Sequence, residues 1–165
     1  MKLPLPQGPD EVTEALFSFE FEPVVLAYNL SALFAAFVLA LPVAWDREQQ
    51  RNSPGLRTFP LVAMGSCAYV LIAQAAFDAS PDAMARILQG LATGIGFVGG
   101  GAILKSDHRV TGTATAAGIW TMGALGAAVA LRRLEIALLL SVVTLATLRW
   151  LKPFKAGKAG APDEG

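Results

Sequence analysis

Four long runs of uncharged, mostly apolar residues dominate the chain, and short polar segments separate them. They cover residues 24–45, 59–77, 87–104 and 111–131, which is 22, 19, 18 and 21 residues. An α-helix needs about 20 residues to cross the ~30 Å hydrocarbon core of a bilayer. Each run is therefore predicted to form one transmembrane helix.

A fifth run, residues 136–148, has only 13 uncharged residues. It reaches membrane length if Glu135 and Arg149 lie at the two interfaces with their charged groups in water. The predicted fold class is all-α, a polytopic membrane bundle of about five transmembrane helices. A soluble fold would need several helices that are apolar on every face, in a chain of 165 residues that is too small to cover them.

The charges cancel in sum but are distributed unevenly. With five spans, nine of the 13 Lys and Arg residues fall on the side that holds the first loop, the third loop and the C-terminal tail. Membrane proteins carry their excess of Lys and Arg in cytoplasmic loops. The N-terminus is therefore predicted to lie outside and the C-terminus in the cytoplasm.

Three segments are predicted along the chain. Residues 1–22 are acidic, and apolar side chains spaced three to four residues apart give this segment one apolar face, as in an interfacial helix. Residues 23–152 are predicted to form the transmembrane domain. Residues 153–165 are rich in Gly, Ala and Lys and are predicted to be a disordered tail.

The polar residues give little support for catalysis or metal binding. His108 is the only histidine and falls short of a metal site, and no second histidine could serve as the base for a Ser, Cys or Thr nucleophile. Cys67 is the only cysteine, so no intrachain disulfide is expected. Residues 94–99 fit the GxGxxG pattern, but a dinucleotide site needs a preceding strand and an acidic residue about 20 positions later. Residues 114–119 contain no acid. We expect no enzyme, no cofactor, no metal site and no nucleic-acid partner.

Glycines concentrate in the third run, where six fall within twelve residues: Gly90, Gly94, Gly96, Gly99, Gly100 and Gly101. Gly90 and Gly94 form a GxxxG motif, which lets two helices approach closely in lipid. We predict that this face packs against a stripe of the fourth run formed by Ala116, Trp120 and Ala124, with Trp120 buried over the glycine backbone. A second small-residue stripe of the fourth run consists of Gly118, Met122, Gly126 and Ala130.

The first loop gathers charges of both signs. Asp46, Arg47 and Glu48 follow the first run, and Arg57 and Thr58 precede the second. We predict that the four charged residues form one ionic cluster at the end of the first two spans. Exposed pairs contribute only ~0–1 kcal/mol, so such a cluster would matter more for function than for stability. A plain solvated loop is the alternative interpretation.

Several ordered motifs resemble those of the MgtC/SapB membrane family over about residues 24–151. They are Asp46-Arg47-Glu48, Pro54-Gly55-Leu56-Arg57-Thr58, the stretch Gly94 to Lys105, and the stretch from Val110 to Trp120. The chain departs from the family pattern at Asp46, Phe59, Gly100 and Thr111, where the family usually has Glu, His, Ala and Arg. The functional candidates are Asp46, Arg47, Glu48, Arg57, Thr58, Gln89, Gly94, Gly96, Gly99, Gly101, Lys105, Thr115 and Trp120.

The resemblance implies a bacterial inner-membrane protein linked to survival under magnesium limitation. It also implies regulation of other membrane proteins, such as an ATP synthase or a cation transporter. MgtC proper carries a further cytoplasmic domain, and residues 153–165 are too few to form one. Functions that depend on that domain are therefore not expected here.

Two functional classes remain open. One is a non-enzymatic regulator in the lipid bilayer that acts through helix contacts, including contacts within a homo-oligomer; the other is a small transporter or channel for Mg²⁺ or another ion. The middle of the first four runs contains no Asp, Glu, Lys, Arg or His, although intramembrane charge usually marks an ion path. Asn29, Gln74, Gln89 and Thr93 either line a polar route or, as we favour, serve as hydrogen-bond partners between helices.

Overall fold

The computed structural model describes residues 22–50, 55–76, 80–106 and 109–150. Within these ranges the chain forms five helices and one antiparallel hairpin. The helices are α2 (Pro23–Glu48), α3 (Thr58–Ala76), α4 (Pro81–Gly101), α5 (Thr113–Ala130) and α6 (Leu134–Trp150), and the hairpin pairs β1 (Leu104–Ser106) with β2 (Arg109–Thr111). The helical class is as predicted, but the sequence analysis did not predict the hairpin. The interfacial helix expected before residue 22 and the disordered tail fall outside the described residues.

Three of the described helices, α2, α3 and α5, are long and apolar enough to cross a membrane. The helix α6 is shorter, at 17 residues, and α4 is less apolar because its first turns carry Asp82 and Arg86. The described part of the chain therefore fits a helical membrane protein.

Local residues set where the helices begin. Pro23 and Pro81 occupy the first turns of α2 and α4, where the missing N–H group removes no helical hydrogen bond. The helix α5 begins after Gly112, whose φ of 85° favours glycine. A side chain at Gly112 would also collide with the carbonyl oxygen of Ala102.

The turn that follows α5 contains a left-handed residue, Arg132, with φ 59°. The N–H groups of Arg133 and Arg132 donate to the carbonyl oxygens of Ala128 and Val129 at 2.9 and 3.0 Å. This is the Schellman arrangement, in which glycine usually takes the left-handed position. Here the Arg132 guanidinium lies 4.7 Å from the ring centre of Tyr28 on α2, a cation–π contact that ties the turn to a neighbouring helix.

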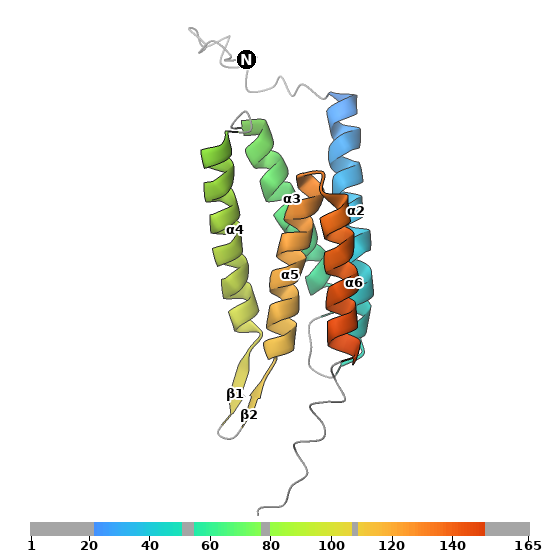
Figure 1. Ribbon diagram of the computed structural model, residues 1–165, viewed down its shortest axis with the longest axis vertical. Coiled ribbons are helices and arrows are strands. Elements are labelled where there is room, and N and C mark those ends of the chain that lie inside the picture. Colours follow the sequence, from blue (N-terminus) through green and yellow to red (C-terminus); the bar gives the residue numbers. More distant parts are fainter. Residues whose placement is uncertain (1–21, 51–54, 77–79, 107–108, 151–165) are drawn as a thin grey trace, which may run out of the picture.

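The helix α5 lies in the middle of the bundle and contacts α2, α3, α4 and α6, whereas α4 lies at the edge (Figure 1). The end of α2, the start of α3, the hairpin and the end of α6 are at one end of the bundle (Figure 1). The end of α3, the start of α4 and the turn between α5 and α6 are at the opposite end. Segments predicted to share a membrane side therefore lie at the same end of the bundle.

Glycines of α5 let α3 approach closely. A Cβ atom on Gly126 would meet the carbonyl oxygen of Ala63, and one on Gly118 would lie 2.9 Å from Cε1 of Phe59. The stripe that contains Gly118 and Gly126 is therefore a packing surface, and its partner is α3.

The helix α4 docks on α5 through one side chain and one glycine. Ile95 of α4 fills the place that a Cβ on Gly123 would need, and a Cβ on Gly99 would lie 3.1 Å from the carbonyl oxygen of Ala116. Ile95 and Gly99 are also the two buried residues of α4.

The predicted contact between the GxxxG face and α5 is wrong. Gly90 and Gly94 have no atom within 4 Å of an added Cβ, and they line a groove between α3 and α4. Trp120 is 52% exposed instead of buried. The physical reason is that α4 and α5 pack through Ile95 of α4, which inserts at Gly123 of α5. This orientation of α4 turns its Gly90 and Gly94 side away from α5.

Two polar side chains bridge helices inside the bundle. The Ser141 hydroxyl on α6 donates to the Leu39 carbonyl on α2 at 2.7 Å. The Gln74 amide on α3 donates to the Ala130 carbonyl on α5 at 3.4 Å. Of the four residues that we favoured as interhelical partners, Gln74 therefore serves as one, whereas the Thr93 hydroxyl donates to the Gln89 carbonyl of its own helix at 2.9 Å.

Candidate functional site

The junction between α2 and α3 carries a buried pair of charges. Asp46 and Arg47 lie in the last turn of α2 and are only 7% and 3% exposed. The Arg47 guanidinium donates from Nη2 at 2.5 Å and from Nε at 3.2 Å to the same carboxylate oxygen of Asp46. Within the described residues this is the only buried ion pair, and it closes one end of an apolar core.

Glu48 holds the chain that follows α2. Its carboxylate accepts a hydrogen bond from the backbone N–H of Leu56 at 2.9 Å. A Cβ on Gly55 would lie 2.6 Å from the Glu48 backbone nitrogen, so only glycine fits there without a shift. The N–H groups of Thr58 and Phe59 then donate to the Gly55 carbonyl at 3.1 Å and start α3. Glu48 therefore positions the entry into the second helix.

The predicted single ionic cluster is wrong, because among the described residues only Asp46 and Arg47 of its four members form an ion pair. Arg57 is exposed, and among the described residues no ion pair joins it to Asp46 or Glu48. The reason is that the Asp46 carboxylate accepts from the Arg47 guanidinium, while the Glu48 carboxylate accepts from the backbone N–H of Leu56.

Other predicted residues belong to the same end of the bundle. Thr58 begins α3, Gly101 ends α4, and Lys105 lies in β1. Thr115 is buried in the first turn of α5. Phe59, which follows Thr58, is fully buried in the core. The hairpin and the start of the middle helix therefore lie at the same end of the bundle as the charged junction (Figure 1).

Four predicted residues lie away from this junction. Gln89, Gly94 and Gly96 are exposed along the middle of α4. Trp120 lines a groove bordered by α4, α5 and α6. The structure does not bring these residues to the charged pair.

Two glycines that shape the site were absent from the candidates. Gly55 follows Pro54, and this dipeptide is a turn signal that could have indicated the close contact with Glu48. Gly112 carries a positive φ, for which its sequence neighbours offer no comparable signal.

Two further charged residues of the junction, Glu48 and Arg57, are exposed. Within the described residues there is no group of three or more His, Cys, Asp or Glu side chains that could hold a metal ion.

Comparison with known proteins identifies the family. The family model described as MgtC family matches residues 33–156, which include the whole charged junction. This chain belongs to the MgtC family. The resemblance inferred from the motifs of the first loop and the third and fourth runs is thereby confirmed.

Relatives in the MgtC family differ in how much of their length the chain covers. Protein SrpB of Synechococcus elongatus is 36% identical over 132 residues, which is 73% of this chain and 72% of SrpB. Protein MgtC of Salmonella typhimurium is 33% identical over 68% of this chain, and that of Brucella abortus 32% identical over 82%. The chain spans 48% and 59% of these two MgtC proteins. No solved structure matches.

Proposed function

We propose that this chain is a non-enzymatic regulator in the bacterial inner membrane, which serves adaptation to low magnesium by contacting other membrane proteins. All five described helices span the bilayer, with the N-terminus outside and the α2–α3 junction and the C-terminus in the cytoplasm. Nine of the 13 Lys and Arg residues on that side support this orientation. An ATP synthase or a cation transporter is the kind of partner expected, and a homo-oligomer is a further one.

The observation that carries this proposal is the buried Asp46–Arg47 pair. Removing two charges from water costs several kcal/mol per ion, and their attraction often fails to offset that cost. A buried pair of this kind therefore adds little to the free energy of unfolding. Its place in the last turn of α2, inside the region that the MgtC family model matches, favours a functional role.

The polar groups of the interior favour regulation over ion transport. Ser141 and Gln74 donate to carbonyls of neighbouring helices, which fixes the helices to one another. Mg²⁺ loses its bound water reluctantly and usually binds one or two carboxylates. The buried carboxylate of Asp46 is the observation that favours the second candidate, a small Mg²⁺ transporter or channel, but Arg47 already neutralises it.

Growth at limiting magnesium tests the role of the junction. In a bacterium whose copy of this gene is deleted, plasmid-borne Asp46→Asn should fail to restore growth, and Asp82→Asn should restore it. Asp82 is a suitable control because it is exposed in the first turn of α4, at the opposite end of the bundle.

A double variant separates function from folding. Asp46→Asn alone leaves Arg47 buried without its partner, which typically costs ~3–5 kcal/mol. Asp46→Asn with Arg47→Gln removes both charges and should recover the amount of protein in the membrane without recovering growth. Growth restored by the double variant would contradict a functional role of the pair.

A further inference from the structure

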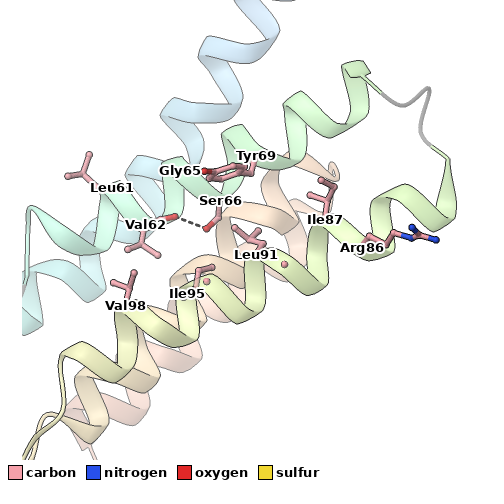
Figure 2. A pocket seen from close by; sticks show the side chains of 12 residues that line it. Leu61, Val62, Gly65, Ser66, Tyr69, Arg86, Ile87, Leu91, Ile95 and Val98 are labelled. Carbon is pink, nitrogen blue, oxygen red and sulfur yellow. Dashed lines mark hydrogen bonds between the residues drawn. The ribbon is translucent and has the colours of Figure 1, made fainter.

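A narrow apolar groove runs between α3 and α4. It has a volume of about 540 Å³, and its walls include Val62 of α3 and Leu91, Ile95 and Val98 of α4 (Figure 2). Gly65, Gly90 and Gly94 form part of its lining, and an added Cβ on any of them would meet no atom within 4 Å. These glycines are therefore not explained by packing within the chain.

The dimensions of the groove decide what can fill it. It extends along α4 from Arg86 to Val98, twelve residue steps, which at ~1.5 Å per residue is roughly 18 Å. Its walls are mostly apolar along this length, so one extended hydrocarbon chain can lie in it beside α4.

The length and the charge of the groove match one leaflet of a bilayer. Half of a ~30 Å hydrocarbon core is ~15 Å, close to the length of the groove. Arg86 lies at one end, beyond Ile87 and toward the first turns of α4 (Figure 2). It is the last charge before the uncharged run that begins at Ile87. An apolar slot with a cation at its end complements a molecule that has one acyl tail beside an anionic head.

The Arg86 guanidinium is available for such a head group. It is exposed, and within the described residues it forms no ion pair, not even with Asp82 one turn earlier on α4. A guanidinium binds phosphate oxygens through paired N–H donors. We propose that the groove between α3 and α4 binds one anionic phospholipid. One acyl chain lies in the groove against its lining glycines, and the phosphate group binds at Arg86.

Native mass spectrometry of the detergent-purified protein tests this inference. The protein is titrated separately with phosphatidylglycerol and with phosphatidylcholine, and the bound lipid is counted. We expect one retained phosphatidylglycerol and about a fivefold preference over phosphatidylcholine, as one basic residue near anionic lipid provides. Arg86→Gln should bind the two lipids alike, whereas Arg133→Gln, which also removes a cation near that end of the bundle, should keep the preference.

Paired glycine variants locate the lipid. Gly94→Leu fills the groove and should lose the retained lipid, whereas Gly96→Leu should keep it. Gly96 is a matched control because it also has free space around an added Cβ but does not line the groove. Thermal unfolding of both variants checks that they remain folded. Equal lipid retention by Gly94→Leu and the parent would overturn the proposal, as would a lipid-free dimer that Gly94→Leu dissociates.

Discussion

The helices α4 and α5 are both rich in glycine, but their glycines meet different surroundings. Gly118, Gly123 and Gly126 of α5 each face an atom of α3 or α4 that leaves little or no room for a Cβ. Gly90 and Gly94 of α4 face open space. The comparison teaches that a glycine-rich helix allows another helix to approach closely. The neighbouring side chains decide at which of the glycines this contact forms.

The difference follows from the side chains that alternate with the glycines. The helix α4 presents Ile95, which is long enough to enter the gap at Gly123. Once that side chain is inserted, only Gly99 of the α4 glycines meets another helix, at the Ala116 carbonyl. The α4 helix therefore lies at the edge of the bundle, with its Gly90 and Gly94 side uncovered by another helix.

Among the contacts between helices, the largest expected effect is at Gly126. In Gly126→Ala the new Cβ meets the Ala63 carbonyl oxygen and lies 2.9 Å from its carbon, and backbone atoms cannot move aside as a side chain can. We expect the free energy of unfolding to fall by ~1–3 kcal/mol, the usual range for overpacking. Thermal or denaturant unfolding in detergent measures it. Gly94→Ala is the control. Equal free energies of unfolding for the two variants would contradict the difference between the glycines of α5 and those of α4.

A smaller effect is expected at Gly123, because the obstructing atom is the Cδ1 end of Ile95. Gly123→Ala should destabilise the protein by about 1 kcal/mol, at the low end of overpacking costs. Ile95→Val removes that carbon, so it should offset the change when the two are combined. A double-mutant cycle gives the coupling energy. Strictly additive effects of the two substitutions would show that Ile95 does not enter the gap at Gly123.

The smallest effect concerns the contact between α6 and α2. Ser141→Ala removes the 2.7 Å hydrogen bond to the Leu39 carbonyl. Interhelical hydrogen bonds in membranes average about 0.6 kcal/mol, and we expect a loss of that size in the free energy of unfolding. A loss comparable to that of Gly126→Ala would mean that polar contacts, not the glycine contacts of α5, hold the bundle together.

Much of the helical architecture is predictable from the uncharged runs. Runs at residues 24–45, 59–77 and 111–131 match α2, α3 and α5 closely, because a membrane helix must be apolar along its whole length and proline or charge marks its ends. The hairpin at Leu104–Thr111 is not predictable in the same way, since two three-residue strands leave almost no pattern.

Contacts between helices are harder to predict than the helices themselves. In lipid both faces of a helix are apolar, so periodicity does not mark the buried side, and the GxxxG face of Gly90 and Gly94 was assigned to the wrong neighbour. Trp120 was misplaced for the same reason. At the junction, the sequence predicts Asp46 and Arg47 as site residues but not their burial, which depends on how the chain after Glu48 folds back.

The central claim is that this member of the MgtC family regulates partners and carries no ion itself. Magnesium flux into liposomes that contain only the purified protein, followed with an enclosed Mg²⁺-sensitive dye, tests it most directly. We predict entry no faster than into protein-free liposomes, for the parent and for Asp46→Asn alike. Entry above that background that Asp46→Asn abolishes would contradict the claim and assign the buried carboxylate to an ion path.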